Sequence, residues 1–284
     1  MSPHTNDREL RHAAREFLYI DSRMAPRTAS GRIRLDSADA MQENFQALFV
    51  TCLMSSARLR HPVEHPETPC LPGIQGYLNC IISRPEALEI HTNTAARIAS
   101  RIMPVLYSGQ RVSGIPGLRL IDHNRRRLRL IHRPTGARLD LIESSCGDWM
   151  TTKEMRVLLN RETGWHLRDG REPLWRQDKV TAMEEPFAEL WARRACTPLR
   201  SAIMTRAMSI WYKSDIYPAW TWPQPGQPHP CLGWDISKGS PNAEEIGHLL
   251  TKSAIRIPHA RYEAASRNSG LLILGDGTVQ LLSA

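Results

Sequence analysis

The sequence predicts an α+β protein, mainly helical, with a central three-stranded antiparallel meander and a C-terminal β-hairpin. Three observations predict this fold class. Apolar residues recur at helical spacing through the first 107 residues, polar and apolar residues then alternate from Leu118 to Ile142, and an Asp276-Gly277 turn divides the last apolar run. Runs of helices followed by runs of strands are typical of α+β folds, whereas parallel α/β folds alternate the two.

Three helices are predicted in the N-terminal part. Apolar residues three and four positions apart predict helices over 6–20 and from Ser37 to about Arg60, before a proline-rich stretch. The segment Ser83-Arg-Pro-Glu86 matches a capping box with proline in the first turn, and it predicts a third helix from Ser83 to Pro104.

The change of hydrophobic period suggests a domain division. We expect a helical layer over residues 1–107 and an α+β part over 108–284, because the period changes from about 3.6 to 2 near the glycines of 108–115. A single compact domain is the alternative, since 284 residues can build one core.

The meander is the clearest pattern in the chain. Its strands are predicted at 118–122, 127–131 and 137–142, where leucines alternate with charged residues. Alternate residues of a strand share a face, so this sheet is predicted to carry a row of guanidinium groups. With the arginines of the turns, this set is Arg119, Arg125, Arg126, Arg127, Arg129, Arg133 and Arg138.

Two interpretations of this arginine row stay open. Guanidinium groups spaced along and across strands can match successive phosphates of a nucleic acid or the acids of a protein partner. Alternatively, the face is solvated and partly neutralised by Asp122, Asp140 and Glu143, or it is buried against acidic helices.

Helices and one further hairpin are predicted after the meander. Thr151 begins a capping box, Asp169-Gly170 is typical of a two-residue hairpin turn, and the last predicted strands run from Leu271 to Leu282. The remaining predicted helices cover 185–196, 197–213 and 240–252, with a short helical stretch after Pro258.

A proline-rich loop over 215–234 carries three tryptophans. Trp220, Trp222 and Trp234 are candidates for stacking on nucleobases or for a protein interface, because exposed tryptophan beside arginine serves both purposes. Packing of the three rings into the core is the alternative.

The composition favours an acidic partner without naming a reaction. The formal net charge is +8, the pI is about 9.5, and arginine outnumbers lysine 32 to 5. A GC-rich genome, selection for anion recognition, or avoidance of lysine by a protein delivered into a host cell would each produce this bias.

The sequence contains no catalytic, cofactor or metal signature. His61 and His65 lie between prolines and no CxxC completes a zinc site, so neither metal nor cofactor is expected. Six scattered cysteines and the lack of a membrane-length apolar run predict a soluble intracellular protein, in the cytoplasm, a host cytoplasm or a viral particle.

These observations favour a non-enzymatic structural or assembly protein, resembling a viral or phage particle component in character, whose arginine-rich surface contacts nucleic-acid phosphates or neighbouring subunits. The first alternative is a lysine-poor effector enzyme whose site is assembled from distant residues, with Cys146 or His166 as candidates. The second alternative is a protein-binding adaptor, which is favoured if the chain's own carboxylates neutralise the arginines.

Overall fold

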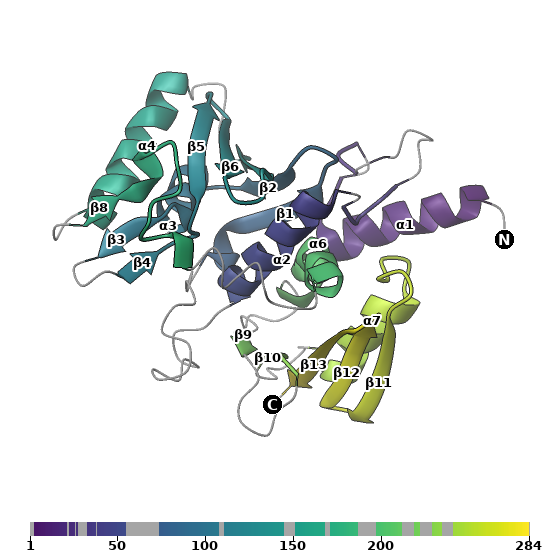
Figure 1. Cartoon of the computed structure of the whole chain (residues 1–284). Helices are drawn as coiled ribbons and strands as arrows, with labels where there is room; N and C mark the ends of the chain where they lie inside the picture. The colour runs from purple at the N-terminus through teal and green to yellow at the C-terminus, as the bar shows by residue number, and fades with distance from the viewer. Residues whose placement is uncertain are drawn as a thin grey trace.

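The fold is seen in a computed structural model (Figure 1) that describes residues 3–21, 23–25, 27, 33–37, 39–54, 74–107, 111–144, 151–167, 171–186, 197–211, 219–221, 229–234 and 241–283. The α-helices of these ranges are α1 (Pro3–Leu18), α2 (Ala40–Met54), α3 (Ala95–Ile102), α4 (Thr152–Leu167), α6 (Thr197–Trp211) and α7 (Ala243–Lys252). The predicted hairpin turn at Asp169-Gly170 and most of the predicted helix over 185–196 lie outside the described residues.

The strands of the first half of the chain are β1 (Leu78–Ser83), β2 (Leu88–Thr92), β3 (Val105–Tyr107), β4 (Arg111–Ser113), β5 (Leu118–His123), β6 (Arg127–His132) and β7 (Arg138–Glu143). Those of the second half are β8 (Glu172–Pro173), β9 (Ala219–Thr221), β10 (Cys231–Trp234), β11 (Arg261–Ser266), β12 (Ser269–Leu274) and β13 (Gly277–Ser283). Two short 3-10 turns accompany the strands: η2 (Gln75–Tyr77) lies directly before β1, and η3 (Leu174–Arg176) directly after β8.

The chain is α+β, but the predicted architecture is wrong. The strands of the described residues form three sheets, with the orders β1-β2-β7-β6-β5, β11-β12-β13-β10-β9 and β4-β3-β8. The predicted meander strands form at β5, β6 and β7, but they are one side of a five-stranded sheet. The predicted terminal hairpin is likewise part of a five-stranded sheet.

The helix predicted from Ser83 is replaced by the β1–β2 hairpin, and α3 begins only at Ala95. Five of the six residues of β1 are buried, because the strand contacts the main core on one face and a second apolar cluster around α1 on the other. A strand buried on both faces reads as a continuous apolar run, so it lacks the alternation that identifies a strand in a sequence. Pairing with β7 also outweighs the local capping-box signal of the turn.

A parallel pair joins distant segments in each of the two large sheets. β2 pairs parallel with β7, which adds the β1–β2 hairpin to the meander. β10 pairs parallel with β13, so the terminal hairpin lies at the centre of its sheet. The helical stretch predicted after Pro258 is instead a turn leading into β11, and α7 packs against β11, β12 and β13.

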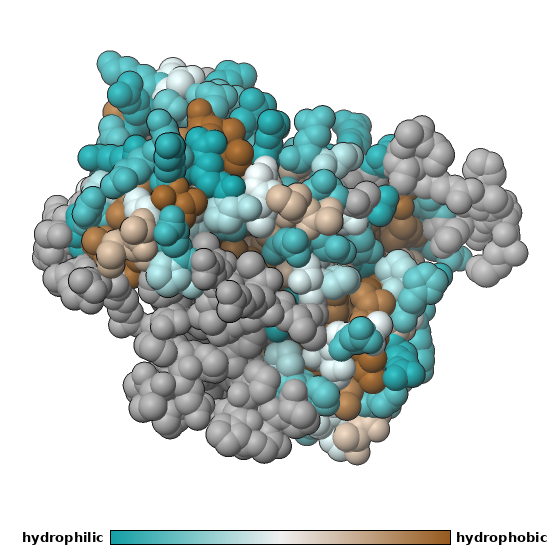
Figure 2. Space-filling view, viewed as in Figure 1, coloured by the Kyte–Doolittle hydropathy of each residue, from teal (hydrophilic) through white to brown (hydrophobic). Residues whose placement is uncertain are grey.

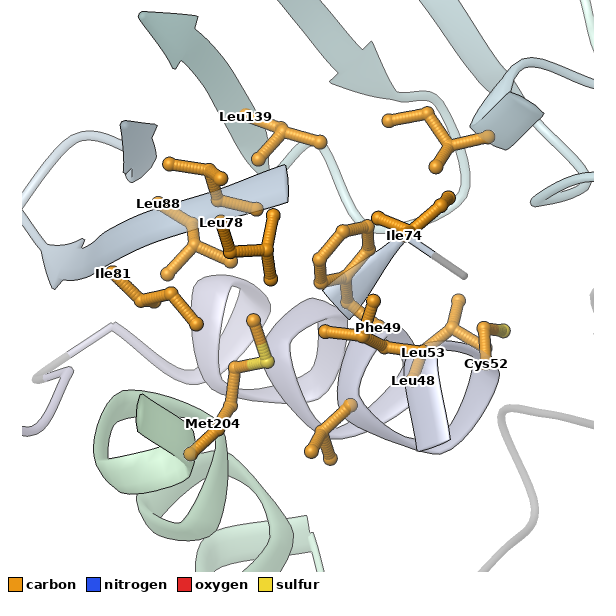
Figure 3. Packing of buried hydrophobic residues seen from close by; sticks show 14 of the residues in the cluster. Leu48, Phe49, Cys52, Leu53, Ile74, Leu78, Ile81, Leu88, Leu139 and Met204 are labelled. Atoms are coloured by element: carbon orange, nitrogen blue, oxygen red, sulfur yellow. The ribbon is translucent and has the colours of Figure 1, made fainter. Parts of the chain in front are cut away.

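A main core connects the elements of both halves of the chain. Helices α2 and α6 pack against each other and against the inner face of the first sheet (Figures 1 and 3). Leu48, Phe49 and Leu53 of α2 lie between Met204 of α6 and leucines and isoleucines of the sheet, including Leu88 and Leu139. Burial of such side chains, each worth about 1.5–3 kcal/mol, is the main stabilising contribution.

Arg119 of β5 is buried against a carboxylate instead of facing solvent. Its guanidinium pairs with Glu184 through Nη1 at 3.0 Å and Nη2 at 2.7 Å, and it also donates to the carbonyls of Leu118, Gln177 and Lys179. Both side chains are almost fully inaccessible to solvent. Burial acts to raise the pKa of Glu184, but hydrogen bonds from Arg119, Gly117 and Thr181 hold that pKa below its ordinary value.

A second buried arginine fixes α6 to two distant segments. Arg206 donates to both carboxylate oxygens of Asp36 and to the carbonyls of Ile255 and Arg256. It joins segments that are far apart in sequence, and its donors meet carbonyl or carboxylate oxygens, as a buried charge requires.

His132 is buried as a neutral ring. Its Nε2 lies 3.1 Å from the carbonyl of Pro116, which can only accept, so Nε2 carries the proton and Nδ1 accepts from Thr135 Oγ1 at 2.8 Å. Burial lowers the pKa of His132 to about 4, and the Pro116 carbonyl offsets this only in part.

Replacing Glu184 with glutamine should lower the free energy of unfolding by about 3–5 kcal/mol, because the Arg119 charge would stay buried without a counter-charge. Urea denaturation monitored by circular dichroism measures the loss. Asp178→Asn, at an exposed position of the same segment, is the control and should change stability by less than about 0.5 kcal/mol. Equal stability of Glu184→Gln and wild type would contradict the assigned role of the pair.

The buried neutral His132 should make the protein less stable in acid. The unfolded chain takes up the proton near the ordinary pKa of about 6.5, whereas the folded chain does so only at about 4, so stability falls across that interval as pH decreases. The loss is roughly 3 kcal/mol. Urea denaturation of wild type and His132→Gln at neutral pH and near pH 4 isolates it as the difference between their pH dependences.

Candidate functional site

The candidate site is a groove on the outer face of the first sheet, with a volume of about 610 Å³. This volume is within the range of small-ligand pockets. The groove is bounded by the β1–β2 turn on one side and by the end of β5 on the other, with β7 and β6 as its floor. Its charged lining residues are Arg84, Glu86, Glu89, Asp122, Arg127, Arg129, Arg138 and Asp140.

Strand register explains why charges of both signs meet here. Glu89 of β2 is paired with Asp140 of β7, Asp140 with Arg129 of β6, and Arg129 with Asp122 of β5. Residues in register across neighbouring strands point to the same face and lie about 4.5–5.5 Å apart. The result is a row of three acids and one arginine, flanked by Arg127 on β6 and Arg138 on β7.

Glu89 is the most strongly held carboxylate of the groove. Its Oε2 accepts from Arg84 Nε at 2.9 Å and lies 3.8 Å from His91 Nε2. Burial acts to raise the pKa of Glu89, but the contacts with His91 and Arg84 are stronger and hold it below its ordinary value. Glu89 is therefore a charged carboxylate at neutral pH.

Asp140 is shielded from solvent at the centre of the groove. Arg127 Nη1 lies 3.2 Å from Asp140 Oδ2, and Arg129 Nε lies 3.9 Å from Oδ1. Burial raises the pKa of Asp140, and the arginines only partly offset that effect. The two neighbouring carboxylates of Glu89 and Asp140 thus have pKa values shifted in opposite directions.

The predicted arginine row is divided among several places. Arg127, Arg129 and Arg138 line the groove, whereas Arg119 is buried with Glu184 and has no access to an external anion. Arg125 and Arg126 lie exposed in the β5–β6 turn and Arg133 in the β6–β7 turn, which are opposite ends of the sheet. The seven arginines do not form one continuous row.

The tryptophans are also dispersed. Trp234 is buried in the main core, where its Nε1 donates to the Pro241 carbonyl at 2.8 Å, so its ring has no free face for stacking. Trp220 belongs to β9, paired with Leu232, and its side chain lies outside the described part of the structure, as does all of Trp222.

Sequence reasoning missed the half of the groove that precedes the meander. Arg84, Glu86 and Glu89 belong to a segment for which we predicted a helix. A signal was present in Leu88-Glu-Ile-His-Thr92, where buried and half-buried residues alternate as in a strand with one covered face.

Glu143 and Cys80 are two further candidate residues that are not part of the groove lining. Asp140 and Glu143 cannot form one acidic site, because Glu143 points inward and accepts from the backbone N–H of Ala95 at the start of α3. Burial raises the pKa of the Cys80 thiol to about 12, which disfavours a reactive thiolate. No group of three metal-binding side chains occurs in the described ranges. Cys146 and the side chain of His166 lie outside them.

The visible surface around α4 and the neighbouring strands is mostly hydrophilic, with small apolar patches between polar residues (Figure 2). Among the helices that the structure describes, none combines the length and the apolar character required to cross a bilayer.

Comparison of the chain with protein-family models, with curated proteins and with solved structures gives no match, so the chemistry of the groove is the basis for assigning a function.

Proposed function

We propose that this protein is a non-enzymatic binding or assembly protein, and that the mixed-charge groove recognises a segment of a protein partner. The observation that carries the proposal is the interleaving of four arginines and four carboxylates in one groove. A protein segment can present both signs of charge in matching order, and such complementarity gives specificity and fixes the register of binding.

The same observation weighs against the phosphate backbone of a nucleic acid as the ligand of the groove. A backbone presents negative charge alone, so Asp122, Asp140, Glu86 and Glu89 would each oppose it. Arg125 and Arg133 form no ion pair with another described residue. Because the turns that carry them lie at opposite ends of the sheet, they do not form one phosphate-binding surface.

A hydrolytic enzyme is the second candidate, favoured by the neighbouring carboxylates Glu89 and Asp140. Opposed pKa shifts in a groove are typical of a paired acid and base. The candidate ranks second because Arg127 lies 3.2 Å from Asp140 and 4.0 Å from Glu89, and so contacts both carboxylates. Among the groove's described lining residues there is also no hydroxyl, thiol or imidazole to add a further catalytic group to the carboxylates.

Two double charge reversals test the proposal. Arg129→Glu/Arg138→Glu alters the groove, whereas Arg125→Glu/Arg133→Glu changes the net charge by the same amount at exposed turn positions. A displayed library of random peptides is selected on wild type, and the affinity of the selected peptides is measured by fluorescence anisotropy. We expect the groove variant to weaken binding at least about tenfold and the turn variant to leave it unchanged.

A labelled single-stranded oligonucleotide is the opposing probe in the same assay. We expect it to bind weakly and to lose affinity equally in both double variants, since non-specific phosphate contacts depend on net charge. Failure to select any groove-dependent peptide, together with tight oligonucleotide binding that only the groove variant abolishes, would replace the proposal with nucleic-acid recognition.

A further inference from the structure

The four arginines of the groove differ in how fully their donors are used. Arg84 donates to Glu89 at 2.9 Å, and Arg127 lies 3.2 Å from Asp140. Arg129 is 3.5 Å from Asp122 and 3.9 Å from Asp140, which are loose ion pairs without a hydrogen bond. The exposed guanidinium of Arg138 forms neither an ion pair nor a hydrogen bond with another described residue.

Arg129 and Arg138 are also neighbours. Arg129 is in register with Asp140, and Ile131 with Arg138, so the two arginines are diagonal partners on the shared outer face of β6 and β7. Diagonal positions are about 7–8 Å apart, which arginine side chains span easily. A planar carboxylate placed between them can accept hydrogen bonds from both guanidinium forks.

We propose that Arg129 and Arg138 bind the side-chain carboxylate of an aspartate or glutamate in the partner segment. This inference rests on the proposed function, because it specifies the ligand group of the same groove. The two arginines are termed the carboxylate clamp below.

The surroundings of the carboxylate clamp favour a carboxylate over a phosphate. A phosphate monoester carries a charge of about −1.5 to −2, and here it would approach Asp140 and Asp122. A single carboxylate, with a charge of −1, suffers roughly half to two-thirds of that repulsion. A peptide also supplies neighbouring residues, so a basic side chain can pair with the exposed carboxylates of Asp122 and Glu86, and an apolar one can cover Ile121, which is 45% exposed.

A double-mutant cycle tests the clamp. The peptide that binds most tightly in the library selection is prepared in several forms, in each of which one aspartate is replaced by asparagine or one glutamate by glutamine. The affinity of every form is measured for the wild-type protein and for Arg138→Gln. At one acidic position we expect the amide to weaken binding to wild type about tenfold or more, and Arg138→Gln to weaken the parent peptide by a similar factor. The amide peptide should bind Arg138→Gln no more weakly than either change alone would allow. Such non-additivity shows that the peptide carboxylate and Arg138 interact.

Three controls make the result specific. Arg129→Gln should reproduce the effect of Arg138→Gln, whereas Arg133→Gln, at the exposed β6–β7 turn, should bind like wild type. Circular dichroism verifies that each variant is folded. Inorganic phosphate should compete with the peptide less effectively than N-acetylglutamate α-amide, whose side-chain carboxylate is free.

The clamp is overturned if every amide form binds as well as the parent peptide, or if the two changes weaken binding independently. Selected peptides that still depend on the groove would then preserve the proposed function without the clamp. Preferential competition by phosphate would also overturn it, in favour of a phosphorylated partner. Failure to select a groove-dependent peptide would overturn both.

Discussion

The parallel pairing of β2 with β7 is the constraint on which the first sheet and the groove depend. It brings the turn that carries Arg84 and Glu86 beside strands from fifty residues later in the chain, and it aligns Glu89 with Asp140. It also directs Glu143 inward, where its carboxylate meets the backbone N–H of Ala95 and fixes the start of α3. One register thus sets the core face and the charged face together, because a shift by one residue would exchange them.

The ion pairs of this protein differ mainly in their access to water. In the pairs Arg119–Glu184 and Arg206–Asp36 the guanidinium is almost completely buried. Each guanidinium also donates to backbone carbonyls of distant segments, and so links those segments to its own. The groove pairs of Arg129 are longer, at 3.5 and 3.9 Å, and the Arg129 side chain is half-exposed, so its guanidinium retains donors that face solvent. Buried pairs are costly to break, whereas exposed pairs contribute little to stability and can rearrange around a ligand. An excess of arginine therefore serves two structural purposes here.

Local pattern predicted those parts of the fold in which one face of an element meets water. The strands at 118–143 alternate leucine with charge, and the helices α1 and α7, each with an exposed face, form near the predicted positions. It failed where burial is two-sided or pairing is non-local, as in β1, which is covered on both faces, and β10, which pairs with a strand almost fifty residues later. Three of the predicted arginines line the groove, but no local pattern reveals that Glu184 lies over Arg119 or that Glu89 adjoins Asp140.

The main core has a consequence for the order of events during synthesis. The Ser201 hydroxyl of α6 donates a hydrogen bond to Gln46 Oε1 of α2, which lies 155 positions earlier in the chain. The apolar cluster that contains the buried residues of α2 also includes Leu272, Val279 and Leu281. A ribosome must therefore expose the side of α2 that packs against α6 for most of translation, before α6 emerges. Contacts of such sequence separation slow folding and leave the nascent chain prone to aggregation, which makes it a natural client for chaperones that shield apolar surface.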